Sequence, residues 1–277
     1  MIMNKDIKII AFDADDTLWD CQGHFERVMQ QLYDELLPWT VTREEAARQL
    51  FATERKNMPL LGFGTKAFTL SMIETALRAS HYEMPAAKVS EIQQLCYTLN
   101  EFPCTPLPEV KETLEELRHY VDSQRQSADD AQASGYGPHA PAHLSPLTIP
   151  EQSSPTRSLS HLSPQKLVCF TKGELLDQEH KLERSGLKDY FDDVVITSDK
   201  TQREFRDLCD RYAIAPRELL MVGNSLKSDI APALAIGAWG VYIPFHVTWE
   251  LEHTEHFDHE RMVQISHFGQ LLDIICR

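Results

Sequence analysis

Residues 8–17 read Lys8-Ile9-Ile10-Ala11-Phe12-Asp13-Ala14-Asp15-Asp16-Thr17. The apolar run before Asp13 predicts a buried β-strand. Because side chains alternate faces along a strand, Asp13 and Asp15 can share an edge only where the strand ends and its loop curls. Two carboxylates placed so close repel each other, and a hard divalent cation with oxygen ligands is the natural means of neutralising them.

The composition is that of a globular protein with a strong acidic balance. The chain has 277 residues, of which 42% are hydrophobic and 25% charged, enough for one large domain or two smaller ones. Its formal net charge of −15 predicts that it repels nucleic acid and anionic membrane surfaces and favours a small metal-bound substrate. The six cysteines show no CxxC spacing, and the sequence has no signal peptide or membrane-length apolar stretch, so we expect reduced thiols in a cytoplasm.

A helical block follows the first strand. Apolar residues recur at helical spacing between Phe25 and Leu37, and Thr42-Arg43-Glu44-Glu45 predicts the start of a second helix. Two more helices are expected at Thr65–Ser80 and Pro85–Asn100, and clustered prolines then mark a stiff linker. We interpret the block as an inserted helical cap domain. The predicted domains are residues 20–105 for the cap and residues 1–19 with 106–277 for the core.

Beyond the linker, strands alternate with helices, which predicts a Rossmann-like α/β core: a parallel sheet with helices on both faces. The helix expected at Glu109–Val121 is followed by residues 123–164, which hold six of the 15 prolines and nine serines. This segment cannot bury enough apolar surface to offset the entropy of ordering, so we expect a disordered insertion, either a spacer or a partner-binding tail. The remaining strands are expected at residues 167–170, 194–197, 219–222 and 240–243.

Each of the first four expected strands ends in a polar cluster. Active sites in open parallel sheets lie at the carboxyl ends of the strands, so these clusters converge if the strands are neighbours. The polar residues concerned are Asp13, Asp15 and Thr17 after the first strand, Thr171 after the second, Lys200 after the third, and Gly223, Asn224 and Asp229 after the fourth.

These residues and their order resemble the motifs of the haloacid dehalogenase superfamily, most closely its phosphatases with a helical cap between the first two motifs. The resemblance covers the chain from Ile7 to about Trp249, apart from the proline-rich insertion. The first motif, Asp-x-Asp-x-Thr, is matched at residues 13–17, the second at Thr171, the third at Lys200, and the fourth at residues 223–229. In this sequence Asn224 stands where the family usually has an aspartate.

The resemblance implies a role for each residue. Asp13 would be the nucleophile that forms an aspartyl-phosphate, and Asp15 the acid and base that serves the leaving alkoxide and the attacking water. Lys200 would hold the Asp13 charge and a phosphate oxygen, and Thr171 would bind another oxygen. Mg²⁺ is the implied cofactor, and the amide of Asn224 predicts a weaker metal site. The implied metal ligands are Asp13, Asp15, Asn224 and Asp229, and the implied substrate-binding residues are Thr17, Thr171, Lys172 and Lys200.

The leading expectation is therefore a magnesium-dependent phosphatase acting on a small phosphorylated metabolite. An acid at Asp15 favours phosphate esters over halides, because a halide leaves without a proton. Two alternatives stay open: a phosphomutase, and a weak or inactive binding protein, which Asn224 motivates. The stretch around Gly62 and Gly64 is either a cap loop that faces the phosphate or an ordinary interhelical turn.

Overall fold

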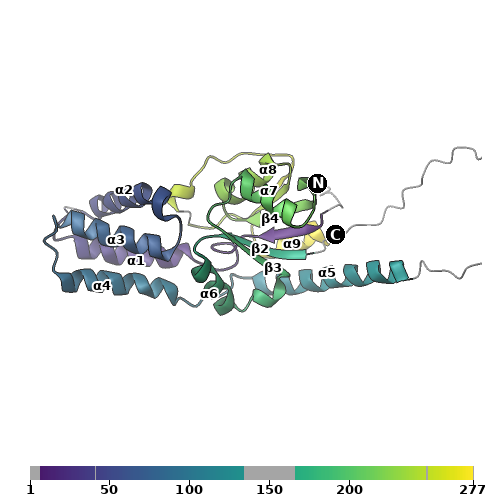
Figure 1. Cartoon of the computed structure of the whole chain (residues 1–277), viewed down its shortest axis with the longest axis horizontal. Helices are drawn as coiled ribbons and strands as arrows, with labels where there is room; N and C mark the ends of the chain where they lie inside the picture. Colours follow the sequence, from purple (N-terminus) through teal and green to yellow (C-terminus); the bar gives the residue numbers. More distant parts are fainter. Residues whose placement is uncertain (1–6, 41, 134–165, 248, 277) are drawn as a thin grey trace, which may run out of the picture.

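The computed structural model describes residues 7–40, 42–133, 166–247 and 249–276. Figure 1 shows a helical lobe, α1 to α4, beside a lobe built on a β-sheet. The longer helices are α1 (Gln22–Leu36), α2 (Arg43–Leu61), α3 (Thr65–Ala79), α4 (Ala86–Tyr97), α5 (Val110–Ala133), α6 (Leu175–Ser185) and α7 (Gln202–Arg211). The shorter ones are α8 (Ala231–Ala235) and α9 (Leu271–Ile275), and the strands are β1 (Ile9–Phe12), β2 (Lys166–Lys172), β3 (Asp193–Thr197), β4 (Leu219–Gly223), β5 (Trp239–Tyr242) and β6 (Met262–Gln264).

The sheet is parallel, with the strand order β3-β2-β1-β4-β5-β6. β1 lies at its centre, between β2 on one side and β4 on the other. The chain therefore winds outward in both directions from β1, and the carboxyl end of β1 is the topological switch point where open α/β sheets bind ligands. This confirms the predicted Rossmann-like fold class.

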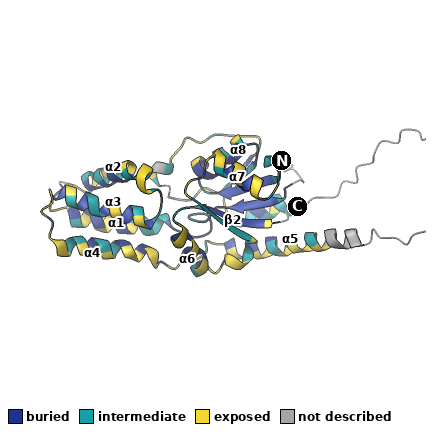
Figure 2. Cartoon of the chain, in the orientation of Figure 1, coloured by how far each residue is buried: buried dark blue, intermediate teal, exposed yellow. Residues whose placement is uncertain are grey.

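Helices cover both faces of the sheet, as alternation along the strands requires. Phe12 belongs to an apolar cluster that includes Leu114 of α5, whereas Ala11, the next residue, belongs to a second cluster with Phe205 of α7. The central strands β1 and β4 are buried along their whole length, whereas β3 at the edge of the sheet is half-buried throughout (Figure 2). Within the described residues, no helix has the length and apolar character that crossing a bilayer requires.

The four helices α1 to α4 form the inserted cap and have an apolar core of their own. α3 packs against both α2 and α4. Two connections join the cap to the sheet, and they lie side by side: the backbone N–H of Leu107 donates to the carbonyl of Leu18 at 2.9 Å. The domain boundaries at residues 20–105 stay a prediction, which this paired linker supports. The cap core includes Val28, Leu32, Leu36, Leu50, Phe68, Met72, Ala76, Ile92 and Cys96.

Helix α5 is longer than predicted. It continues to Ala133, so the expectation of disorder from residue 123 is wrong for residues 123–133. The prolines of the segment begin only at residue 138, and Arg118 and Arg125 anchor the helix by ion pairs of 2.9 and 2.7 Å to Asp192. Residues 134–164, which carry the rest of that expectation, lie outside the described residues.

Two further elements differ from the sequence prediction. The edge strand β6 was not predicted, because its three residues are too few for a periodicity to register. The sequence predicts a helix at Ser228–Ile236, closed by Gly237, but the structure begins it as a π-helical turn, Leu226–Ile230, before α8. Such turns often occur at functional sites, and this one carries Asp229.

Candidate active site

Asp13 lies directly after β1, at the switch point of the sheet. Its backbone N–H donates to the carbonyl of Val222 in β4 at 2.9 Å, which continues the ladder one residue past the strand. The chain then turns sharply: Asp16 has a φ of 61°, and its Oδ1 accepts the N–H groups of Cys21 and Gln22, both at 2.8 Å, where α1 begins. This turn directs the residues after β1 away from the sheet and into the cap.

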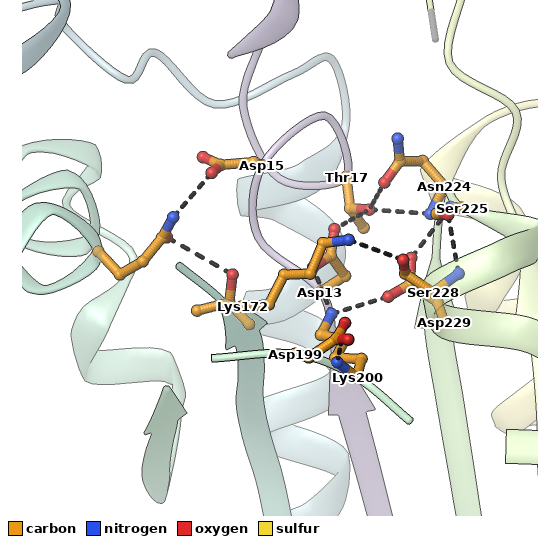
Figure 3. Close-up of polar contacts among 12 residues, drawn as sticks. Asp13, Asp15, Thr17, Lys172, Asp199, Lys200, Asn224, Ser225, Ser228 and Asp229 are labelled. Carbon is orange, nitrogen blue, oxygen red and sulfur yellow. Dashed lines mark hydrogen bonds and ion pairs between the residues drawn. The ribbon is translucent and has the colours of Figure 1, made fainter. Parts of the chain in front are cut away.

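A buried lysine joins two carboxylates at this point. Lys200 Nζ lies 2.5 Å from Asp13 Oδ1 and 2.7 Å from Asp229 Oδ1, and its side chain is fully buried (Figure 3). Burial, reinforced by the charge of Asp229, raises the pKa of Asp13 although Lys200 opposes the shift. Burial disfavours the ammonium of Lys200, but the two carboxylates outweigh it and raise its pKa. With all three groups ionised, the cluster keeps one net negative charge.

The Asn224 side chain closes the other side of Asp13. With its Nδ2 turned inward, the two amide hydrogens face three acceptors: Thr17 Oγ1 at 3.0 Å, Asp13 Oδ2 at 3.1 Å and the backbone carbonyl of Asp15 at 3.3 Å. Thr17 Oγ1 can then donate its single proton to Asp13 Oδ2 at 3.1 Å. With Oδ1 turned inward, oxygens of Asn224, Asp13 and Asp15 would converge, and a cation would be needed among them.

These atoms fit a magnesium ion. One carboxylate oxygen, one backbone carbonyl and one amide oxygen are hard ligands, and Mg²⁺ usually takes few protein ligands and keeps several waters. In the described part of the chain, no group of three His, Cys, Asp or Glu side chains could hold a metal. Any metal at Asp13 would therefore depend on the amide and the carbonyl. Asp229 uses Oδ1 for Lys200 and Oδ2 for the N–H of Ser225, so both of its oxygens are engaged inside the protein.

Asp15 points away from Asp13 (Figure 3). Its Oδ1 accepts from Trp19 Nε1 at 2.8 Å, and its Oδ2 accepts from Gln178 at 2.8 Å and from Lys181 at 3.0 Å. Burial works against ionisation, but Lys181 and these hydrogen bonds outweigh it and hold the pKa of Asp15 below its usual value. In this position Asp15 is an ionised carboxylate.

A cavity of about 170 Å³ lies between the cap and the carboxyl edge of the sheet. Asp13, Asp15 and Thr171 line it from the core, and Phe63 lines it from the cap loop between α2 and α3. Gly62 and Gly64, which flank Phe63, line it as well. This cap loop therefore faces the cavity that Asp13 opens into.

No protein-family model matches the chain. A structure described as a haloacid dehalogenase-like family hydrolase from Xanthomonas campestris superposes with a TM-score of 0.68 at 26% identity, covering 94% of this chain and 86% of that one. The chain belongs to the haloacid dehalogenase-like hydrolases.

Curated relatives match over shorter segments. N-acylneuraminate-9-phosphatase of Mus musculus is 30% identical over 77 residues, which are 26% of this chain and 31% of the relative. Glyceraldehyde 3-phosphate phosphatase of Pyrococcus furiosus is 28% identical over 115 residues, 39% of this chain and 46% of that protein. The match thus spans less than half the length of these curated relatives.

In this haloacid dehalogenase-like chain, the structure brings the motif residues to one edge of the sheet. Asp13, Thr17, Lys200, Asn224 and Asp229 form one hydrogen-bonded cluster. Thr17 and Lys200 use their polar atoms for contacts within that cluster. Neither is one of the described residues that line the cavity. The predicted substrate contacts at these two positions therefore stay proposals.

The other two residues with predicted phosphate contacts differ in their surroundings. Thr171 is buried on the cavity wall, 3.5 Å from Gln178 Oε1. Lys172 is bound by Ser228 Oγ at 2.7 Å and Glu252 Oε1 at 2.5 Å, and it lies 4.0 Å above the ring of Phe63. Its ammonium is thus held beside the cavity by a segment near the C-terminus.

Sequence reasoning missed one base and one acid of this haloacid dehalogenase-like site, Lys181 and Glu252. Lys181 is almost fully buried and joins Asp15 to Asp177, which lies 3.1 Å away. The i,i+4 spacing of Asp177 and Lys181 was a readable signal for an ion pair, but not for its contact with Asp15. Glu252 accepts from Ser225 at 2.7 Å, Ser228 at 2.6 Å and Lys172, and no local pattern connects it to them.

Proposed function

We propose that this protein is a magnesium-dependent phosphatase that hydrolyses the phosphate monoester of a small metabolite. The observation that supports this most is the position of Asp13: it opens into the cavity, with Lys200 on one carboxylate oxygen and the Asn224 amide on the other. A carboxylate so placed can act as a nucleophile toward phosphorus. The curated relatives are named as phosphatases, in line with this reaction class.

The residues that would hold Mg²⁺ are Asp13, Asn224 and the backbone carbonyl of Asp15. When bound there, the ion supplies positive charge that screens Asp13 from the phosphate dianion. Asp229 contributes by holding Lys200, since its own oxygens are engaged. Lys200 in turn orients the Asp13 carboxylate and offsets its charge.

The proposed reaction has two displacements. A carboxylate oxygen of Asp13 forms a bond to phosphorus while the bond from phosphorus to the ester oxygen breaks, and the leaving alkoxide takes a proton from Asp15. Water then attacks the phosphorus of the aspartyl-phosphate and gives its proton to Asp15. Orthophosphate leaves, and both carboxyl groups return to their starting states.

Asp15 has to leave its observed position and take up a proton from water before the first displacement, because it is ionised where it stands. Lys181 and Gln178 hold it as an anion, turned away from Asp13. α6 carries both of these partners and also contacts the cap, where Thr65 donates to Asp177 at 3.4 Å. Closure of the cap therefore triggers the release of Asp15 in this proposal.

The direct experiment measures hydrolysis of p-nitrophenyl phosphate with and without Mg²⁺. We expect turnover that needs the metal and is lost in Asp13→Asn. Asp207→Asn, an exposed change of the same type on α7, is the matched control and should keep wild-type activity. Full activity in Asp13→Asn would refute the nucleophile assignment.

Two further outcomes separate the alternatives. Conversion of a sugar phosphate into its isomer without free phosphate would favour a phosphomutase. No turnover on a broad phosphate panel, with no thermal stabilisation by beryllium fluoride and Mg²⁺, would favour a binding protein, because a working site is stabilised by mimics of the phosphoryl group.

We also propose that the protein resides in the cytoplasm. All six cysteines lie in the described residues and are free thiols, and five of them are buried. Free thiols are typical of a reducing compartment. Cell fractionation with an antibody against the protein tests this, and recovery in an oxidising compartment would contradict it.

A further inference from the structure

A buried carboxylate on the cap faces the same cavity as Asp13. Glu54 of α2 is only 8% exposed, yet it lines the cavity wall. Among the residues that the structure describes, none forms a hydrogen bond or an ion pair with its side chain. Burial is the larger cause and the charge of Glu250 the smaller one, and together they raise the pKa of Glu54 to about 7. Buried carboxylates normally have partners, and this one is open only to the cavity, where a ligand can supply the partner.

The neighbouring cap surface also offers acceptors. Asn57 lies three residues after Glu54, so both are on one face of α2, and both line the cavity. The Asn57 amide nitrogen is used by Ser71 Oγ at 3.2 Å and Glu74 Oε2 at 3.0 Å, and Ser71 donates to the carbonyl of Ala67 at 3.0 Å. A ligand on this wall must therefore bring the donors.

The lysines of the cavity wall are not available to balance Glu54. In the described part of the chain these are Lys172, which is paired with Glu252, and Lys181, which is paired with Asp15. The charge of Glu250, an exposed residue of the core, also disfavours ionisation of Glu54 and raises its pKa. Apart from Gln22 of α1, the rest of the cap wall is apolar and includes aromatic rings, among them Phe25 and Phe68, whose faces attract cations.

We propose that Glu54 determines specificity by binding an ammonium group on the alcohol portion of the substrate. The preferred substrates are then phosphate monoesters of small amino alcohols or amino sugars. This inference rests on the proposed phosphatase function. An ammonium beside Glu54 gives the buried carboxylate the partner that it lacks. A substrate that carries a second carboxylate there meets the charge of Glu54 instead and is disfavoured.

The test compares esters that differ in one group. Phosphoethanolamine, 2-hydroxyethyl phosphate and phosphoglycolate carry an ammonium, a hydroxyl and a carboxylate at the same place, and glucosamine 6-phosphate and glucose 6-phosphate form a larger pair. At pH 8 we expect kcat/KM to favour each amine over its hydroxyl counterpart by about tenfold or more, the scale of one charge-assisted hydrogen bond. Phosphoglycolate should be the slowest.

Variants assign that preference to one residue. In Glu54→Gln the amine-to-hydroxyl ratio should fall close to one, because the amide carries no charge. Glu83→Gln makes the same charge change at an exposed cap position and should keep the wild-type ratio. If the esters are hydrolysed without a preference for amines, the amine site is refuted. The same follows if the preference persists in Glu54→Gln. Either result would still support the proposed phosphatase function.

A binding measurement covers the case in which no ester is hydrolysed. Ethanolamine hydrochloride, compared with sodium chloride at equal ionic strength, should raise the Tm of the wild type and of Asp13→Asn but not of Glu54→Gln. That result without turnover would refute the phosphatase and keep the amine site. No turnover and no Glu54-dependent shift would refute both.

Discussion

Lys200 Nζ lies 2.5 Å from Asp13 Oδ1; the lysine side chain is fully buried, whereas the aspartate reaches the cavity. The lysine follows β3 at one side of the sheet, whereas the aspartate ends β1 at its centre. Because Lys200 also binds Asp229, a single buried ammonium stabilises two carboxylates. The charge balance of the site therefore depends on one side chain.

Removal of that ammonium should be costly. In Lys200→Met, Asp13 and Asp229 would remain buried without a counter-charge, and breaking such a pair typically costs about 3–5 kcal/mol. We expect the free energy of unfolding from urea denaturation, without added metal, to fall by that amount. Lys166→Met, an exposed change on β2, should stay within about 0.5 kcal/mol of wild type. Equal stabilities of the two variants would contradict the buried triad.

Asn224→Asp should strengthen Mg²⁺ binding. The substitution keeps the shape of the side chain and adds a charge beside Asp13 Oδ2, which lies 3.1 Å from the amide. A carboxylate cannot donate as the amide does, so the metal-free variant should be less stable and the Mg²⁺-loaded variant should recover. Titration calorimetry should show binding tighter by about 1–2 kcal/mol, the scale of one charge-assisted contact. An unchanged Mg²⁺ affinity would place the metal away from Asn224.

Gly223→Ala should disrupt the site from the end of β4. A Cβ at this position would lie 2.7 Å from the Cβ of Asp229, which cannot retreat because Lys200 and the N–H of Ser225 hold its carboxylate. We expect a loss of about 1–3 kcal/mol in urea denaturation, typical of overpacking, together with loss of phosphatase activity. Met221→Leu conserves volume on the same strand and should cost less than about 1.5 kcal/mol. A stable, active Gly223→Ala would show that Asp229 is free to move.

Glu54 should make stability depend on pH. Its pKa rises from 4.5 in the unfolded chain to about 7 in the folded one, so the folded state holds the proton more tightly. Its favourable contribution is therefore complete below pH 4.5 and is lost as pH rises through 7. Glu54→Gln should become more stable than wild type by roughly 3 kcal/mol at pH 8 and lose most of that advantage by pH 5.

The measurement is the difference in unfolding free energy between Glu54→Gln and wild type from pH 5 to 8, without ligand. Other buried acids titrate in both proteins and cancel in the difference. Glu83→Gln, at an exposed position, should give a flat difference over the same range. If the difference for Glu54→Gln is also flat, the carboxyl group of Glu54 in the wild type already has a partner in the folded protein.

Local sequence patterns were sufficient for the fold and for the grouping of the motif residues. The apolar run ending at Asp13 predicted β1, and the alternation of strands and helices predicted the parallel sheet. The capping residue Thr42 marked a helix start that the structure confirms. Each of these signals depends on neighbours within one turn or one strand, so a single sequence contains them.

Tertiary structure alone decided what surrounds each side chain of the site. Asp15 is held by Lys181, 166 residues away, and Lys172 by Glu252, 80 residues away. Nothing in the spacing of α2 indicates that Glu54 faces the cavity rather than solvent. These contacts join segments that come together only when the sheet has formed and the cap has packed against it. The burial of these side chains and their charged partners therefore depend on the folded structure, whereas the motif residues could be identified from the sequence.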